Sequence, residues 1–313
     1  MIRSYHEFNN WQLQALPTDK ETEFTFGFEL EIEKGENGTI ELALLSNILE
    51  NRFGNLFVHE RDGSLVDGFE IISQPMTWNW FTSNISTIRA LFAIINKFNY
   101  SSHNGGRCGL HVHVSRKSLL EESMLSNDVS EITRKTRERD VIVNICYVLE
   151  RYQKEIVKFT RRKSTTYCRA RSQLTTLGNG TEVIDKDLIK TGVHFETTST
   201  DRRKNLNLKN SKTIEFRIFR GTLVWETFLI SLNLVRNIVN NAKIEQNVID
   251  LEKLILTGLK PKHKKYAKEY CEQRELIDLN EKHISLDKFT RTVNVNDTSH
   301  VIAVCNAIIG RDN

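Results

Sequence analysis

Residues 24–33 have the sequence FTFGFELEIE, in which every even position is apolar. A side-chain period of two is typical of a β-strand, so the apolar side chains are expected to cover one face of a sheet. The opposite face then carries Glu29, Glu31 and Glu33. Carboxylates that share a strand face repel one another, and a divalent cation between Glu29 and Glu31 would reverse that repulsion. A solvated face of an edge strand is the structural alternative.

A second alternating stretch, CGLHVHVS at residues 108–115, places His111 and His113 on one face and apolar residues on the other. Imidazole binds metal ions and can donate to a phosphate oxygen. The alternative is a pair of histidines with ordinary hydrogen bonds in a half-buried sheet. Residues 105–109 include three glycines, which let a backbone approach a ligand closely and so favour a functional role.

The third stretch, TIEFRIFRGT at residues 213–222, places Glu215 and Arg217 on one strand face. A structural ion pair would account for this pattern. The functional alternative is a metal-binding carboxylate beside a guanidinium that stabilises charge on a transferred phosphoryl group. Together the three strands predict a sheet face that holds several cations against a nucleotide.

The remaining periodicities predict an α+β fold with a mostly antiparallel sheet, because some strands are joined by short turns and others are separated by long helices. Further strands are expected at 55–60, 66–73, 206–207 and 213–219, and helices at 39–52, 78–100, 139–160 and from 226 onward, with a break at 258–261.

The composition is that of an ordinary globular protein, with 39% hydrophobic and 27% charged residues among 313. The length permits one or two domains. The chain contains only 3 prolines, and this scarcity argues against Pro-rich linkers. The net charge of +4 is too small for a dedicated nucleic-acid binder. Basic residues gather in 134–171, including Arg161 and Arg162. This stretch is either a solvated helix face or a positive wall for a polyphosphate or an acidic substrate.

Five scattered cysteines with no C-x-x-C pair favour a reducing cytoplasm over a disulfide framework or a zinc ribbon. Residues 1–14 contain no apolar run of signal-peptide length, and no segment approaches the roughly 18 apolar residues of a membrane span. We therefore expect a cytoplasmic protein that binds neither a membrane nor nucleic acid.

Six motifs occur in the order GFELEIE, RDGSL, GFEIISQP, CGLHVHVS, KNLNL and TIEFRIFRGT. In this order they resemble the amidoligase family, which is related to glutamine synthetase and glutamate–cysteine ligase. The resemblance covers roughly residues 24–240. It implies a half-barrel, a curved and mostly antiparallel sheet flanked by helices. We accordingly expect an arm at 1–23, a glutamine synthetase-like catalytic domain at 24–245 and a helical C-terminal extension at 246–313 packed on the same body.

The resemblance implies an enzyme that joins a carboxylate to an amine. ATP, as co-substrate, phosphorylates the carboxylate, and the amine attacks the acyl phosphate to give an amide or peptide bond. Two or more Mg²⁺ or Mn²⁺ ions are expected. The acid and the amine would be small molecules, peptides or protein side chains, and the oligomeric state is left open.

By the same resemblance, the site residues divide between two metal ions and the nucleotide. The expected metal ligands are Glu31 and Glu70 at one ion, and Glu29, His111 and Glu215 at the ion that bridges the β- and γ-phosphates. The expected nucleotide-binding residues are His113, Arg217 beside the γ-phosphate, and Arg220 as a second phosphate or substrate clamp. Arg217, Glu215 and Glu29 are the expected catalytic residues.

Other polar residues complete the candidate set. Relatives carry more carboxylates at the first metal ion than this sequence shows. Either Glu60 or Asp62 supplies the missing ligand, or the site holds fewer ions. The substrate-binding candidates are Asp62, Arg169, Arg171, Lys204 and Asn207. Asp62 is also an ordinary turn residue. Residues 172–200 are the expected cover that keeps water from the acyl phosphate.

Two other functions fit the same residues. One is a catalytically inactive scaffold or binding protein that keeps the nucleotide and metal site, because a fold alone does not establish chemistry. The other is a metal-dependent phosphotransferase or hydrolase. The complete residue set favours an enzyme, and a requirement for ATP would separate a ligase from a hydrolase.

Overall fold

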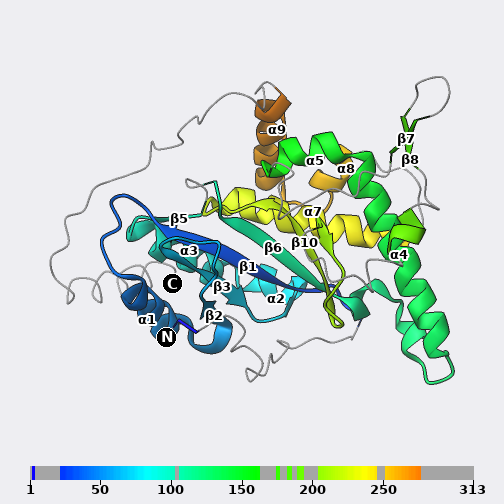
Figure 1. The fold of residues 1–313 in the computed structure, drawn as a ribbon, viewed down its shortest axis with the longest axis horizontal. Coiled ribbons are helices and arrows are strands. Elements are labelled where there is room, and N and C mark those ends of the chain that lie inside the picture. The colour runs from blue at the N-terminus through cyan, green and yellow to red at the C-terminus, as the bar shows by residue number, and fades with distance from the viewer. Residues whose placement is uncertain are drawn as a thin grey trace.

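The computed structural model describes residues 2–3, 22–102, 106–162, 174–176, 182–184, 189–193, 204–244 and 251–275. Within them, helices pack against an antiparallel sheet (Figure 1). The expected α+β class is therefore confirmed at this level, and the sheet is open, with β2 and β9 at the two ends of its strand order. The closer likeness to a glutamine synthetase half-barrel stays a prediction. Most of the expected arm and the last part of the C-terminal extension lie outside the described residues.

The sheet is built around β1 (Thr25–Lys34). Its strand order is β2-β3-β1-β6-β10-β9, and the short strands β4 and β5 also pair with β1. The other strands are β2 (Phe57–Glu60), β3 (Gly68–Ser73), β4 (Met76–Thr77), β5 (Tyr100–Ser101), β6 (Gly109–Ser115), β9 (Leu206–Asn207) and β10 (Thr213–Arg220). The described strand pairings in this sheet are all antiparallel.

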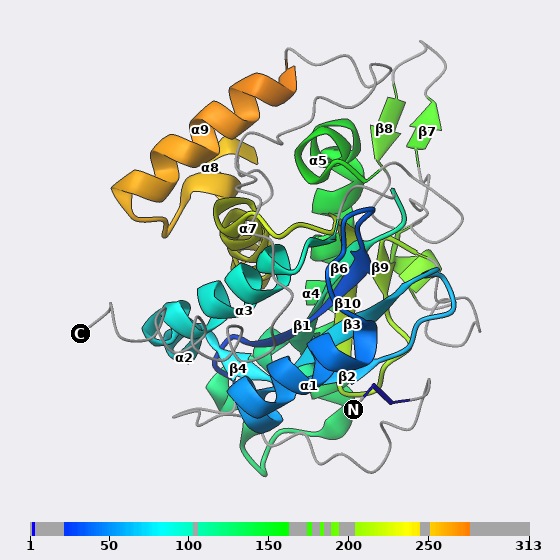
Figure 2. The same cartoon turned by 90° about the vertical axis from the view of Figure 1, so that its left-hand side faces the viewer.

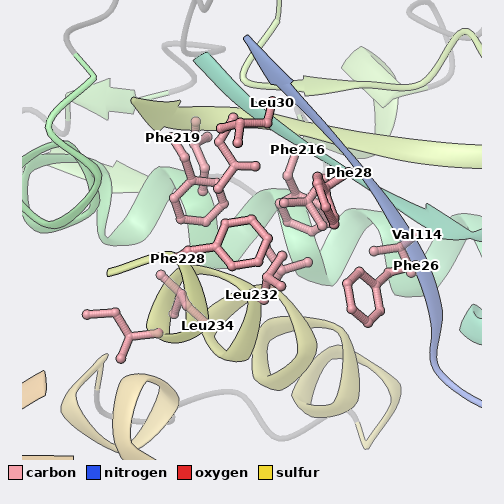
Figure 3. Close-up of a cluster of buried hydrophobic side chains, with 14 of the residues drawn as sticks. Phe26, Phe28, Leu30, Val114, Phe216, Phe219, Phe228, Leu232 and Leu234 are labelled. Atoms are coloured by element: carbon pink, nitrogen blue, oxygen red, sulfur yellow. The ribbon is translucent and has the colours of Figure 1, made fainter. Parts of the chain in front are cut away.

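Helix α7 (Trp225–Lys243) packs on the apolar face of the sheet. Figure 3 shows Phe26, Phe28 and Leu30 of β1 on the side of the strand that faces α7, the helix that carries Phe228. The Phe228 ring centroid lies 5.1 Å from that of Phe28 and 4.9 Å from that of Phe92. The even positions of β1 are thus buried in the core, as their alternation predicts.

The remaining helices surround this layer. They are α1 (Leu42–Phe53), α2 (Trp78–Ser83), α3 (Ile85–Lys97), α4 (Glu131–Arg151), α5 (Gln153–Thr160), α8 (Leu251–Leu256) and α9 (Pro261–Glu275), with 3₁₀ turns at Gly54–Leu56, Arg116–Leu119 and Glu122–Leu125. Helices α2, α3 and α7 lie together beside the sheet, and α8 and α9 lie beyond α7 (Figure 2). Among the described residues, no helix combines the length and apolar character needed to cross a membrane.

Two segments expected to be single helices are each divided. The periodicity at 78–100 comes from α2 and α3, which meet at Asn84, whose side-chain amide donates to a carbonyl of the preceding turn at 2.8 Å. Helix α4 begins before residue 139 because the Ser130 hydroxyl accepts a backbone N–H at 3.1 Å and caps its N-terminus. Tyr152, with φ −106° and ψ 27°, separates α4 from α5.

Strand β10 contains a β-bulge that simple alternation does not predict. Its register with β6 shifts between Phe216 and Phe219. Both rings face the core in Figure 3. A bulge places an additional residue on one strand and bends it, so it changes the direction of β10 just beyond Arg217.

Two expectations about peripheral segments stay predictions. Within 172–200, β7 (Leu174–Thr176) pairs with β8 (Glu182–Ile184), and residues 189–193 are helical. The role of this segment as a cover is untested. The domain boundary near residue 245 is also untested, although the amides of Asn233 and Asn237 both donate to the Thr257 carbonyl, at 3.0 and 2.9 Å, and join α7 to the segment after α8.

We predict that Phe228→Ala lowers the free energy of unfolding by about 3–5 kcal/mol, because Phe228 is fully buried against other aromatic rings. Urea denaturation measures this value. The matched control is Ile132→Ala, at a side chain that is 79% exposed, which should change stability by no more than about 0.5 kcal/mol. Equal losses in the two variants would contradict this description of the core.

Candidate metal centre

The polar face of the sheet brings together residues from six neighbouring strands, β2, β3, β1, β6, β10 and β9. Their cross-strand pairs are Glu60 with Glu70, Glu70 with Glu31, Glu29 with His111, His113 with Glu215, and Glu215 with Asn207. Because side chains alternate along each strand, these residues lie on the face opposite the Phe28 core. The antiparallel register therefore assembles a cluster that the individual motifs only suggest.

The first part of the cluster consists of the carboxylates of Glu31, Asp62 and Glu70. One oxygen from each lies within 4.8 Å of the others. Asp62 lies in the turn after β2, where its Oδ1 accepts the Ser64 N–H at 2.5 Å. Oε2 of Glu31 accepts the backbone N–H of Gly109. If all three carboxylates were ionised, they would repel one another strongly at this spacing.

The pKa of Glu70 reflects the closeness of these carboxylates. Burial raises the pKa of the Glu70 carboxyl, and the neighbouring negative charges of Glu29 and Glu31 raise it further, to about 11. At neutral pH and without a cation, Glu70 therefore holds its proton. A divalent cation would compete with that proton for the same oxygens.

The second part of the cluster centres on Glu29, which lies between two histidines. Nε2 of His113 is 2.9 Å from Glu29 Oε1, and Nδ1 of His111 is 3.1 Å from Glu29 Oε2. Burial acts to raise the pKa of Glu29, but His113 and His111 outweigh burial and hold it well below its ordinary value. Burial acts to lower the pKa of His113, but Glu29 outweighs it and raises the pKa to about 9. Both partners are therefore charged at neutral pH.

The third part is Glu215 with its neighbours on β9 and β10. Its Oε2 accepts the Asn207 amide at 2.6 Å, and its Oε1 pairs with the Arg217 guanidinium. Nδ1 of His111 lies 3.5 Å from the same Oε1. Burial acts to raise the pKa of Glu215, but the nearby positive groups, His113 foremost together with His111 and Arg217, outweigh burial and lower the pKa. This carboxylate is held in place from two sides.

The donor set fits divalent cations. Three groups each offer ligand atoms within 4.8 Å of one another: Glu31, Asp62 and Glu70; Glu29, Glu70 and His111; and Glu29, His113 and Glu215. Nε2 of His111 makes no hydrogen bond within the part of the chain that the structure describes, and it lies 3.7 Å from Glu31 Oε1. Carboxylate oxygens suit Mg²⁺ and Mn²⁺, and imidazole extends the range to other transition metals.

These groupings differ in detail from those that the family resemblance implies. Asp62, named as a substrate-binding candidate and as a possible additional carboxylate, lies with Glu31 and Glu70. His113, expected nearer the nucleotide, groups with Glu29 and Glu215, and His111 groups with Glu29 and Glu70. The groupings are geometric, and the role of each residue stays a prediction.

The other candidates are placed less centrally. Asn207 donates its side-chain amide to Glu215, and Lys204 is half-buried. Arg220 is half-buried and opposes Gly109 across β10 and β6. Arg169 and Arg171 lie outside the described residues.

Sequence reasoning missed two contributors to the site. The Gly109 N–H binds Glu31, and the Thr213 hydroxyl lies 3.3 Å from His113 Nδ1. A Cβ at Gly109 would lie 2.2 Å from Arg162 Nη1 and 3.0 Å from His111 Nε2, so the close approach requires glycine. The glycine-rich run before β6 was the available signal, but the partners depend on the strand register.

Comparisons with known proteins give remote likenesses. No protein-family model and no curated protein matches the chain. Among solved structures, the chain is similar to a bifunctional glutathione synthetase from Pasteurella multocida, with 12% identity over 82% of this chain and a TM-score of 0.45. It is also similar to PafA, the ligase in a complex with the prokaryotic ubiquitin-like protein Pup, with 7% identity over 93% of this chain and a TM-score of 0.35. This chain spans 47% and 63% of those chains. At these scores neither likeness supports an argument about fold or chemistry.

We predict that Glu70→Gln raises the melting temperature at pH 8 in the presence of a chelator by about 3 °C or more. Because the folded-state pKa of Glu70 is raised to about 11 from an ordinary value of 4.5, its contribution to stability is fully present below pH 4.5. That contribution is lost progressively as the pH rises toward 11. The glutamine stays neutral, so its advantage should shrink toward zero near pH 4.5.

Glu36→Gln is the control, since Glu36 is exposed and the variant makes the same change of charge. It should shift the melting temperature by less than about 1 °C at both pH values. A Glu70→Gln variant that is less stable than wild type at pH 8, or whose effect does not depend on pH, would show that the carboxylates do not repel one another as described.

Proposed function

We propose that this chain is an ATP-dependent carboxylate–amine ligase that uses Mg²⁺ or Mn²⁺ and forms an amide or peptide bond through an acyl phosphate. The observation that carries the proposal is the overlap of the three ligand groups, which share Glu29 and Glu70. Shared carboxylates keep neighbouring cations close together. Closely spaced cations suit a polyphosphate, because Mg²⁺ in phosphoryl-transfer sites is bound by a few carboxylates together with substrate phosphates.

The residues would act in two sets. Glu31, Asp62 and Glu70 would hold one cation, and Glu29, His113 and Glu215 would hold another, with His111 between the sets. When bound, such cations neutralise the charge that develops on the phosphate oxygens. The hydrogen bonds of Glu31 to Gly109 and of Glu215 to Asn207 would keep the carboxylates in position.

Arg217 would stabilise the transferred phosphoryl group. Its guanidinium is anchored by Glu215, lies 3.5 Å from His111 Nδ1 and has a side chain that is 20% exposed, so it retains access to a ligand. The γ-phosphoryl group passes to a carboxylate oxygen of the acid, and ADP leaves. The amine nitrogen then bonds to the acyl carbon, phosphate leaves with the C–O bond pair, and the nitrogen loses a proton. Exclusion of water protects the acyl phosphate between these steps.

The family resemblance of the six motifs supports the same reaction and extends it to small-molecule, peptide or protein acids and amines. It also supports ATP over other phosphoryl donors.

We predict that Mg²⁺ and ATP together raise the melting temperature of the wild-type chain, because a ligand that binds only the folded state stabilises it. At about 100 times the dissociation constant the gain is about 2.7 kcal/mol, and neither Mg²⁺ nor ATP alone should produce it in full. The Glu29→Gln/Glu31→Gln double variant should lose this stabilisation. Differential scanning fluorimetry provides the measurement.

Glu33→Gln is the control on the same strand, since Glu33 belongs to none of the three ligand groups, and it should retain the stabilisation. Acid–amine pairs are then screened for ADP release. Phosphate release from a substrate without ATP would favour the metal-dependent hydrolase instead. A folded wild type that gains no stability at saturating Mg²⁺ and ATP would contradict the proposed nucleotide site and, with it, the ligase.

A further inference from the structure

Four arginines gather at one end of the sheet, outside the three ligand groups. Arg220, the last residue of β10, opposes Gly109, the first residue of β6. The Arg162 guanidinium lies over the same glycine, since a Cβ there would be 2.2 Å from its Nη1, and Nη1 donates to the Phe219 carbonyl at 3.1 Å. Arg162 and Arg220 are therefore neighbours at the end of β6.

Helix α9 brings a further arginine to this place. The Arg274 guanidinium lies 4.2 Å from the Tyr270 ring centroid, and the Tyr270 hydroxyl donates to the Phe159 carbonyl of α5 at 2.9 Å. Arg161 follows the end of α5 in a left-handed conformation, with φ 58°. Helices α5 and α9 lie side by side, as Figure 1 shows, so the end of α5 lies near the end of α9.

The charges in this arginine set act on one another. Burial lowers the pKa of Arg161, and the nearby guanidiniums of Arg274 and Arg220 lower it further. Burial lowers the pKa of Arg220, and Arg274 lowers it further. The two charges that act most on Arg161 therefore have the same sign as its own. In an ordinary structural ion pair, a neighbouring carboxylate would instead raise the pKa of the arginine.

The arginine set adjoins the candidate metal centre. The Gly109 N–H donates to Glu31, and a Cβ at Gly109 would meet both Arg162 and His111. Gly109 and His113 are four residues apart on β6, which corresponds to about 13 Å at the rise of a β-strand. A ligand held by the arginines would thus reach the carboxylates from the Glu31 end, away from His113 and Glu215.

We propose that Arg161, Arg162, Arg220 and Arg274 form a binding subsite for an oxyanion, a carboxylate or phosphate group of a molecule that also reaches the metal centre. Guanidinium groups suit this role because their planar donors match the geometry of both anions. The subsite gives helix α9 a direct part in ligand binding. It extends the proposed ligase site but does not depend on that reaction, because an anion can bind the arginines without ATP or metal.

The test measures anion binding by isothermal titration calorimetry in a chelator at low ionic strength, with pyrophosphate and glutarate as separate probes. At least one probe should bind the wild type saturably in the millimolar range or tighter. Arg161→Gln and Arg274→Gln should each weaken that binding by about tenfold or more, since each removes a charged donor. Arg274→Lys keeps the charge but loses the planar donors, so it should weaken binding of the probe less than Arg274→Gln does. If Arg274→Gln does not fold, Arg274→Lys takes its place in the comparison.

The matched control is Lys265→Gln, which removes one positive charge from an exposed position on the same helix and should bind the probe as the wild type does. If the arginine variants lose mainly pyrophosphate binding, the subsite is assigned to a phosphate group. If they lose mainly glutarate binding, it is assigned to a carboxylate. The proposal is overturned if neither probe binds the wild type, or if folded Arg161→Gln and Arg274→Gln bind as tightly as Lys265→Gln. The Glu29→Gln/Glu31→Gln variant should still bind the probe, so failure of the metal centre and failure of this subsite are distinguishable.

Discussion

Repulsion among carboxylates on one face of a sheet is the constraint on which the rest of this structure depends. Glu31, Glu60 and Glu70 are directly opposed across three antiparallel strands, an arrangement that would destabilise the sheet if all three were ionised. The opposite face compensates, because Phe26, Phe28 and the other apolar residues of the same strands pack on α7 in one core. The strands are therefore held in register by their apolar face, and the polar face is free to accumulate charge.

Part of that charge is balanced within the protein, and the balance is uneven. Glu29 is paired with His113, and Glu215 is paired with Arg217, so each of these carboxylates has a cationic partner within reach. Glu70 instead faces negative neighbours, which together with burial raise its pKa to about 11. The half of the cluster around Glu31, Asp62 and Glu70 is thus short of positive charge, whereas the half around Glu29 and Glu215 is nearly balanced. A cation would gain most at the first half.

The sequence predicted the faces of the strands but not their register. A period of two determines which residues share a face, so the positions of Glu29, Glu31, His111 and His113 could be anticipated. The register depends instead on turns and on packing between strands that are distant in the chain. For that reason the turn residue Asp62 could be named but not placed, and the bulge beyond Phe216 was not anticipated. The expected helix at 78–100 failed for a local reason, because two helices with one common apolar face produce the same periodicity as a single helix.

The two charged clusters meet at Gly109, where the hydrogen bonds described for Arg162 and Glu31 go to backbone groups. A protein selected for stability alone would be expected to pair the arginines with the carboxylates, since separated like charges are costly on both sides. Instead, Arg162 donates to the Phe219 carbonyl, and Glu31 accepts the Gly109 N–H. Backbone groups thus satisfy these side chains while most of their charge is retained. A ligand that carries both a cation and an anionic group would stabilise both clusters at once, so occupation of one cluster should favour occupation of the other.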